Sequence, residues 1–160
     1  MIQPTNISRS SQTILNIFKI ILFSGGLIAG PISAAEVTII RDEHGTPHIY
    51  AEDTYGIYYG YGYSIAQDRL YQMDMAKRST QGTVAEVLGA EYVDFDVSTR
   101  ANYDPASIMS QLAQLNEDDR HIFEGYAAGM NDWIDEVITN QESLMPKQFI
   151  DNDFQPEHWT

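Results

Sequence analysis

The sequence of 160 residues contains no cysteine. This absence excludes disulfide bonds, thiolate catalysis and zinc sites with cysteine ligands. An exported chain without disulfides depends on its hydrophobic core, on a metal ion or on partner chains for its stability. The length corresponds to about one domain, so the chain has room for one modest core.

Basic residues are scarce: 9 Lys and Arg residues stand against 23 Asp and Glu residues, and the formal net charge is −14. A surface this acidic repels phosphate groups, whereas nucleic-acid binding requires clustered positive charge. We therefore expect no nucleic-acid partner. The acidity favours solubility and says little about the fold or the chemistry.

The first 35 residues form a separate segment that contains no acidic residue. Arg9 and Lys19 precede an apolar run from Ile20 to Gly30, and the mostly small residues of Pro31–Ala35 follow. This order of a basic region, an apolar region and a small-residue cleavage site is typical of a secretory signal peptide.

A membrane anchor is the alternative interpretation of this segment. A membrane-spanning helix needs about 20 consecutive apolar residues, and Ser24–Gly26 interrupt the run here. We therefore predict a signal peptide at residues 1–35, cleaved after Ala34 or Ala35, with no membrane association after cleavage. Residues 36–160 form the exported part.

The exported part begins with two β-rich runs, Val37–Arg41 and Pro47–Ala51, separated by turn residues at 42–46. Two short strands around a glycine-containing turn predict a β-hairpin. We expect Gly45 to supply the positive φ that the turn needs.

A long helix is predicted from Asp53 to about Ser79, with Asp53 or Thr54 as its cap. Apolar residues recur there at three- and four-residue spacing, which predicts one inward face: Tyr58, Tyr61, Ile65, Ala66, Leu70 and Met73. Asp74 and Arg78 are expected to pair on the solvent side. The helix also contains glycines, each costing about 1 kcal/mol relative to alanine, so we expect close packing against another backbone at Gly56, Gly60 and Gly62.

Further helices follow, and each is amphipathic. A short one is predicted over Thr83–Leu88 with Gly89 at its end. Asp104 and Pro105 open another, and Asn116 opens a third long helix. Their predicted inward residues are Ile108, Met109, Leu112 and Leu115 in one, and Ile122, Phe123, Tyr126, Ala127, Met130, Trp133, Ile134 and Val137 in the other. We expect irregular structure after Asn140, with an aromatic tail that looks cut.

Few residues offer catalytic chemistry, because the sequence has no nucleophile elbow, phosphate loop or histidine pair at metal-ligand spacing. His44 and His48 are interpreted as a turn and a strand histidine bonded to backbone, in preference to a ligand or general base. His121 and His158 are expected to be exposed. Asp151, Asp153 and Gln155 faintly resemble a calcium loop that lacks its glycine and closing glutamate.

A second polar group lies on the long helix. Asp68, Arg69 and Gln72 are expected to form a buried polar network that fixes how this helix meets its partner, with pocket lining as the alternative. Seven tyrosines occur between Tyr50 and Tyr71. We interpret them as an aromatic interface in preference to a pocket.

Four strings resemble one family in the same order. They are RDEHGTPHIYA at 41–51, YGYGYSIAQDRLYQMDMAKRSTQGTVAEVLG at 59–89, GYAAGMNDWID at 125–135 and LMPKQF at 144–149. Together they are similar to the start of the α chain of penicillin G acylases. The first string and the AQDRLYQM part of the second also resemble cephalosporin and acyl-homoserine-lactone acylases, whereas RSTQGTVAEVLG and PKQF point more narrowly to penicillin G acylase.

The resemblance implies an α+β fold: a mainly helical α-chain segment with an N-terminal β-hairpin, part of the αββα sandwich of N-terminal nucleophile hydrolases. Residues 36–160 would be the N-terminal portion of the α chain of a periplasmic precursor that is cut into two chains. Its heterodimer partner is the β chain, whose N-terminal serine attacks a small-molecule amide such as penicillin.

The resemblance assigns no catalytic, substrate-binding or metal-binding residue to this sequence. In that family the nucleophile belongs to the β chain, and the acyl-contacting residues and calcium-binding glutamate of the α chain lie beyond these positions. Calcium is therefore implied only through ligands outside this sequence. The internal serines cannot offer a free α-amine, so none is a candidate nucleophile: Ser64, Ser79, Ser98, Ser107, Ser110 and Ser143.

Two other functions remain open from the sequence. One keeps the fold and changes the substrate to that of an acyl-homoserine-lactone or cephalosporin acylase. The other is a non-catalytic helical binding module of the periplasm, which would have to fold stably at this length.

Overall fold

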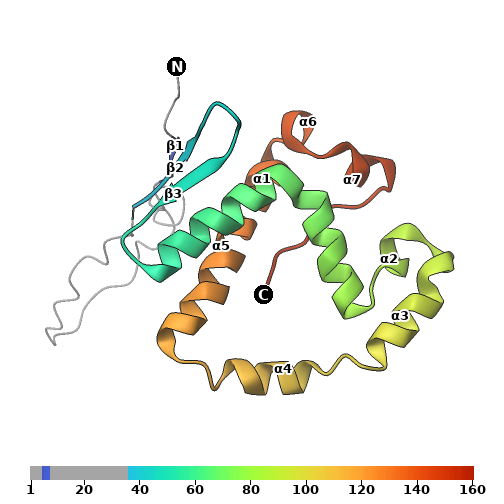
Figure 1. Ribbon diagram of the computed structural model, residues 1–160. Helices are drawn as coiled ribbons and strands as arrows, with labels where there is room; N and C mark the ends of the chain where they lie inside the picture. Colours follow the sequence, from blue (N-terminus) through green and yellow to red (C-terminus); the bar gives the residue numbers. More distant parts are fainter. Residues whose placement is uncertain (1–4, 8–35) are drawn as a thin grey trace, which may run out of the picture.

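The computed structural model describes residues 5–7 and 36–160, so the predicted signal peptide lies almost wholly outside the described residues. The described part is mostly helical, with one small sheet (Figure 1). Its strands are β1 (Thr5–Ile7), β2 (Val37–Arg41) and β3 (Pro47–Tyr50). Its helices are α1 (Thr54–Gln81), α2 (Ala85–Leu88), η1 (Ala90–Tyr92), α3 (Val93–Arg100), α4 (Pro105–Leu112), α5 (Glu117–Thr139), α6 (Gln141–Leu144) and α7 (Lys147–Asp151).

The predicted hairpin is confirmed. Strands β2 and β3 pair antiparallel with Ile39 opposite Ile49, and β1 pairs antiparallel along the other edge of β2. Gly45 has the expected positive φ of 80°. The carboxylate of Asp42 accepts hydrogen bonds from the backbone N–H groups of His44 and Thr46, which fixes the turn between the strands.

The long helices α1 and α5 cross in close contact, and glycines set their separation. Gly62 on α1 lies against the backbone of Tyr126, while Gly125 and Gly129 on α5 lie against the backbone of α1. The expected compensation for helix glycines is therefore confirmed for Gly62. For Gly56 and Gly60 the prediction of close packing against a backbone was wrong. These two glycines face side chains of Val37, Ile49, Ala51 and Asp53.

The main core lies between α1 and α5 and extends under the C-terminal helices. Its fully buried members include Met130, Ile134 and Val137, as the sequence predicts. Phe149 of α7 is also fully buried in this core. The expectation of irregular structure after Asn140 was wrong, because α6 and α7 fold there and Phe149 anchors them through apolar burial.

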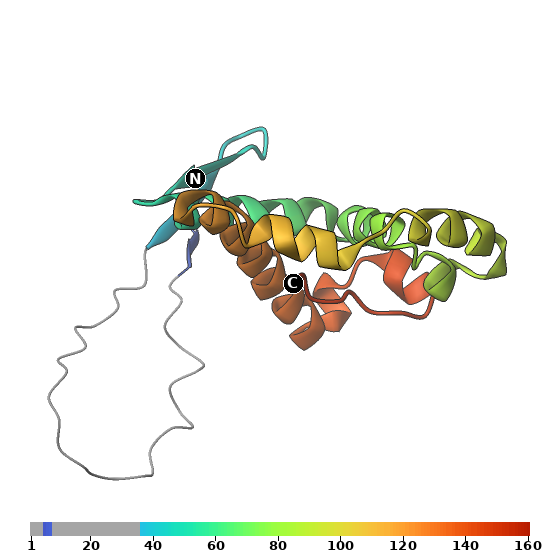
Figure 2. The same cartoon turned by 90° about the horizontal axis from the view of Figure 1, so that it is seen from below.

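The backbone of Arg69 is not helical, and α1 kinks there. The second half of α1 leads to α2 and α3, which lie at the opposite end of the molecule from the sheet (Figure 2). Asp96 of α3 is buried and accepts hydrogen bonds from the backbone N–H groups of Val84 and Ala85. The predicted short helix with Gly89 at its end is confirmed as α2, whereas α3 was not predicted.

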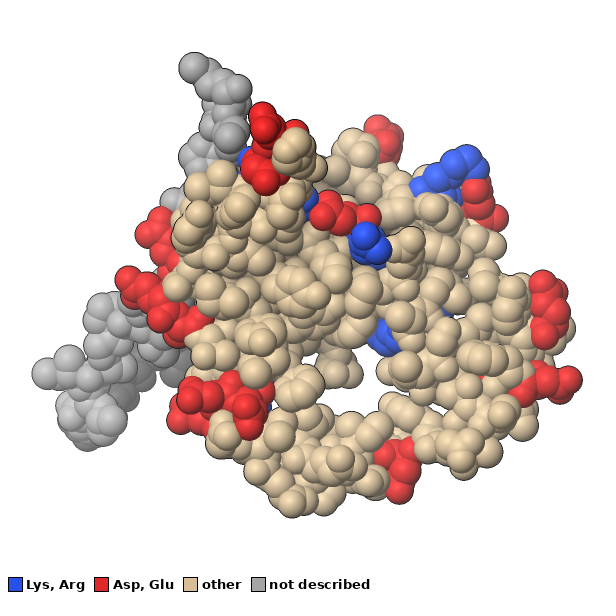
Figure 3. All heavy atoms as spheres, in the orientation of Figure 1, with Lys and Arg blue, Asp and Glu red and all other residues tan. Residues whose placement is uncertain are grey.

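Helix α4 forms where Asp104 predicts it, since this side chain accepts a hydrogen bond from Ser107 N–H. Its predicted inward face is wrong within the described chain: Ile108 is 43% exposed and Met109 is 64% exposed. Figure 3 shows why, because an opening passes between α4 and the α1–α5 pair. The apolar face of α4 borders this opening.

Candidate functional site

The two histidines of the hairpin, His44 and His48, each lie beside a different carboxylate. His48 Nε2 lies 3.3 Å from an Asp42 carboxylate oxygen, and His44 Nε2 lies 3.6 Å from Glu43. Both side chains are exposed. Each side chain lies beside a carboxylate, where a backbone partner was expected from the sequence.

The proposed network of Asp68, Arg69 and Gln72 is wrong, because all three residues are exposed. Asp68 instead pairs with Arg41 of β2 at 3.0 Å. Arg41 also donates to Gln67 Oε1 and to the carbonyl of Gly45. Through these contacts Arg41 links the hairpin turn to α1. The partner of Asp68 is therefore a residue distant in sequence.

The tyrosine-rich stretch forms an aromatic interface, and two of its members, Tyr58 and Tyr61, line an apolar groove that is described below. Tyr59 donates its hydroxyl to Asp132 at 2.6 Å, and Tyr63 donates to Glu136 at 2.7 Å. Both side chains are buried in a cluster that also contains Val37 and Ile39 of β2. Burial of Tyr63, and then its hydrogen bond to Glu136, raises the pKa of its phenol above the ordinary value.

This raised pKa predicts a loss of stability in alkali. An unfolded tyrosine ionises near pH 10, so the stabilising effect of neutral Tyr63 is fully present below that pH and is lost as pH rises toward its folded pKa. We expect the free energy of unfolding to fall less steeply above pH 10 in Tyr63→Phe than in the native protein. Urea unfolding across this pH range, with phenolate absorbance to follow ionisation, measures the difference; equal slopes would contradict it.

A buried ion cluster lies on the second half of α1. Arg78 donates through Nε to Asp74 at 2.8 Å, and these residues are only 3% and 1% exposed. The sequence-based expectation that this pair faces solvent was therefore wrong, because the C-terminal segment covers it. Arg78 also pairs with Glu157 of that segment at 3.1 Å. Burial alone would lower the pKa of Arg78, but Asp74 and then Glu157 raise it above the ordinary value.

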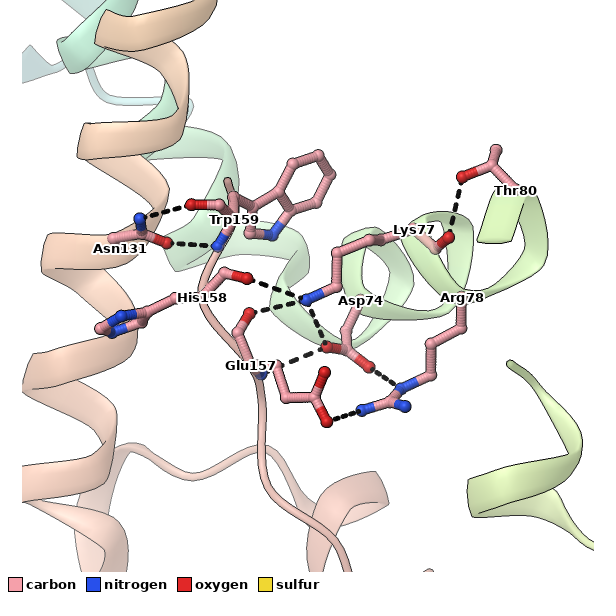
Figure 4. A network of polar contacts seen from close by, with 8 residues as sticks. All are labelled: Asp74, Lys77, Arg78, Thr80, Asn131, Glu157, His158 and Trp159. Carbon is pink, nitrogen blue, oxygen red and sulfur yellow. Dashed lines mark hydrogen bonds and ion pairs between the residues drawn. The ribbon is translucent and has the colours of Figure 1, made fainter. Parts of the chain in front are cut away.

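The same segment is held by its backbone. Asn131 of α5 accepts the N–H of Trp159 at 2.7 Å and donates to the carbonyl of Trp159 at 2.9 Å. Lys77 of α1 donates to the carbonyls of Glu157 and His158 at 2.8 and 3.3 Å. Figure 4 shows these side chains converging on the segment from the two helices. We call residues 157–159, held in this way, the clamped segment.

The remaining candidate residues are those of the faint calcium-loop resemblance and the last two histidines. Asp151 pairs with Lys147, and Asp153 has a positive φ of 56°. Within residues 5–7 and 36–160, no group of three or more His, Cys, Asp or Glu side chains is placed to hold a metal ion. His158, which is exposed as expected, lies 2.8 Å from Asp135, whereas His121 is half-buried against Tyr55.

An apolar groove of about 1030 Å³ lies beside the clamped segment. Helices α1, α4 and α5 form its walls, and Trp159 and Thr160 lie at its edge. Its lining residues include Tyr58, Tyr61, Met109, Leu112, Phe123 and Tyr126. Phe123 was predicted to point inward, but it is 55% exposed at this groove.

Comparison with known proteins identifies the family. A family model described as penicillin amidase matches residues 36–160. The chain belongs to the penicillin amidase family. It is 58% identical over 127 residues to penicillin G acylase of Escherichia coli, which covers 79% of this chain and 15% of that protein. It is 29% identical over 126 residues to an acyl-homoserine lactone acylase of Pseudomonas putida, with the same coverage.

A solved structure of this family supports the fold. Thermostable penicillin G acylase from Alcaligenes faecalis matches with a TM-score of 0.75 and 51% identity, over 79% of this chain and 66% of that one. Thus the described residues form part of a penicillin amidase fold. The chain spans about 15% of the length of the Escherichia coli and Pseudomonas putida relatives.

The family strings contain the residues of the buried ion cluster and those that bind the clamped segment. Of these contacts only the Asp74–Arg78 pair was predicted from the sequence, and it was expected on the solvent side. Asp74, Lys77 and Arg78 lie in the string at 59–89, and Asn131 lies in the string at 125–135. One signal was available: two cations and one acid fall within five residues near the end of this long helix. Lys77, Arg78 and Asn131 attach residues 157–159 to α1 and α5.

Proposed function

We propose that this chain is part of a periplasmic penicillin acylase that hydrolyses the side-chain amide of penicillins with a phenylacetyl-type acyl group. The observation that carries the proposal is the 58% identity to Escherichia coli penicillin G acylase over 127 residues. An acyl-homoserine-lactone or cephalosporin acylase is the second candidate. The lower identity of 29% to the Pseudomonas putida acyl-homoserine lactone acylase makes it the weaker one.

The chemistry of the proposed enzyme resides outside these 160 residues. Its nucleophile is the N-terminal serine of a β chain, with the α-amine of that serine as the base, since a hydroxyl nucleophile needs an adjacent proton acceptor. Donors of the β chain stabilise the oxyanion. A relative from Pseudomonas named penicillin acylase 2 proenzyme, 33% identical over 106 residues, is consistent with such processing. The proposed enzyme also binds calcium, through ligands outside these 160 residues.

The described residues act as a scaffold in this proposal. The hairpin joins the αββα sandwich, and the helices pack against the β chain. Large apolar side chains that stay exposed support this role, because such surface usually marks a contact: Tyr61, Val97, Met109, Phe123 and Ile150. None of the described helices is long and apolar enough to span a membrane. The signal peptide predicted at residues 1–35 supports export to the periplasm.

The proposal predicts two chains. We expect N-terminal sequencing of the complete protein from the periplasm to yield one chain that starts at Ala35 or Glu36 and one that starts with serine. The purified pair should hydrolyse a phenylacetyl amide much faster than a long-chain acyl-homoserine lactone. The reverse preference would support the second candidate, and a single inactive chain without a serine-led partner would support a binding module.

A further inference from the structure

Strand β1 belongs to the predicted signal peptide, yet it pairs with the first strand of the exported part. Residues 5–7 lie opposite residues 37–39 in antiparallel register, with Asn6 facing Thr38. Strand β2 is therefore the middle strand of the sheet, between β1 and β3 (Figure 1). In the chain that still carries residues 5–7, both edges of β2 have a neighbour.

Strand β1 supplies a main-chain neighbour along one edge of β2. The side chains of Val37 and Ile39 are buried in a cluster with Tyr59 and Tyr63 of α1, so the helix covers them. The sequence of β2 is VTIIR, and four of its five residues are β-branched, which favours strand pairing. An edge of this kind that loses its neighbour is a template for pairing with another chain.

In the proposed enzyme, export separates β1 from β2. Strand β1 precedes Arg9 and Lys19, whereas β2 follows the apolar run from Ile20 to Gly30. The basic residues stay on the cytoplasmic side, while the chain after the apolar run crosses the membrane. The hydrocarbon core is about 30 Å thick, but paired strands lie only about 4.8 Å apart. The pairing of β1 with β2 is therefore possible before export and not after it.

We propose that β1 is a temporary edge strand, which covers the β2 edge in the precursor before export and is removed from it by export. The inference rests on the proposed function, in which residues 1–35 direct export and the hairpin joins a larger sheet. Before export, the cover keeps a β-branched edge from pairing with other chains. The edge opens for the larger sheet only in the compartment where the acylase assembles.

Disulfide trapping tests the pairing in the complete precursor, because residues 1–160 contain no cysteine that would compete. Asn6→Cys is combined with Thr38→Cys, its partner in register, or with Tyr50→Cys, which lies opposite Thr38 on β3. Paired residues of antiparallel strands have Cα atoms about 4.5–5.5 Å apart, within the limit of about 7 Å for a disulfide. Positions 6 and 50 are two strand spacings apart, about 10 Å, and form the matched control.

The compartment is the second variable of this experiment. Leu22→Asp places a charge in the apolar run and keeps the precursor in the cytoplasm. Ala34→Phe with Ala35→Phe removes the small residues of the cleavage site and leaves an exported, uncleaved chain. After mild oxidation of the retained precursor, we expect roughly tenfold more disulfide between positions 6 and 38 than between positions 6 and 50. The exported chain should contain almost none. Equal yields for the two cysteine pairs, or for positions 6 and 38 in the two compartments, would overturn the proposal.

A second comparison tests the cover itself. Successive N–H groups of a strand point to opposite sides, so Asn6→Pro with Ile7→Pro removes one N–H that faces β2. Asn6→Thr with Ile7→Thr keeps both N–H groups and is the control. In the retained precursor we expect amide hydrogen exchange at residues 37–39 to be roughly tenfold faster with the prolines than with the threonines. Equal exchange in the two variants would show that β1 does not cover this edge.

Amide hydrolysis by the exported and cleaved enzyme is assayed separately. An active enzyme whose retained precursor forms no disulfide between positions 6 and 38 sinks the temporary strand alone. An inactive enzyme whose retained precursor forms the expected disulfide sinks the proposed function alone.

Discussion

Gly129→Ala is expected to lower the free energy of unfolding by about 2–4 kcal/mol, because overpacking against a backbone cannot be relieved by a rotamer change. A Cβ at this position would lie 2.0 Å from the Tyr59 carbonyl oxygen and 2.7 Å from the Tyr63 nitrogen. Both atoms belong to the backbone of α1. The helices must therefore move apart, which loosens the core around Met130 and Ile134. On an isolated helix the same change would stabilise by about 1 kcal/mol.

Gly60→Ala is the matched control for this prediction. A Cβ there would meet the Ile49 side chain at 2.5 Å and the Val37 side chain at 3.1 Å, and neither contact involves backbone. These side chains can adjust, so we expect a smaller loss than for Gly129→Ala. Urea unfolding of the complete protein followed by circular dichroism measures both. If Gly60→Ala were the more damaging change, the backbone crossing would not control the packing of α1 on α5.

Local signals in the sequence located most elements. Asp53, Asp104 and Asn116 were predicted to open helices, and each side chain accepts a hydrogen bond from a backbone N–H three residues later. The turn at Gly45 was predicted for the same reason, since a positive φ is a local requirement. These interactions span a few residues, so the chain encodes them without reference to the rest of the fold.

The errors in predicted burial and in the C-terminal helices arise from tertiary contacts, which a local sequence pattern does not contain. Phe149 lies in a stretch without clear periodicity, yet its burial against Tyr71 and the α5 core holds α7 in place. The face of α4 was misjudged for the opposite reason. Its helical period is clear, but a period shows which residues share a face and not what covers that face.

The polar clusters were the least predictable part. Asp68 pairs with Arg41, 27 residues away, in place of the neighbouring Arg69. The clamp joins Asn131 to Trp159 across 28 residues. Side-chain contacts at such separations depend on how α1, α5 and the C-terminal segment lie together. The family strings marked the regions that contain these residues, but not the partners.

The removal of Asp74 is the second change with a large expected effect. Asp74→Ala leaves Arg78 buried with Glu157 as its remaining carboxylate partner. Breaking one side of a buried ion pair costs about 3–5 kcal/mol, because Arg78 then loses its buried partner, keeps only the exposed carboxylate of Glu157 and regains no water. The clamped segment should loosen as well, since Asp74 also lies 3.5 Å from the Glu157 N–H. Urea unfolding measures the loss, and faster proteolysis near Glu157 reports the loosening.

Two controls separate charge burial from simple loss of contacts. Glu157→Gln should cost at most about 1 kcal/mol, because an exposed ion pair is worth little and the Glu157 side chain is 67% exposed. The double variant Asp74→Leu with Arg78→Met removes both buried charges together. It should recover most of the stability lost in Asp74→Ala, since apolar replacement of a buried pair is often neutral. If the double variant were as unstable as Asp74→Ala, the cluster would act through its hydrogen bonds to the clamped segment and not through the stranded charge of Arg78.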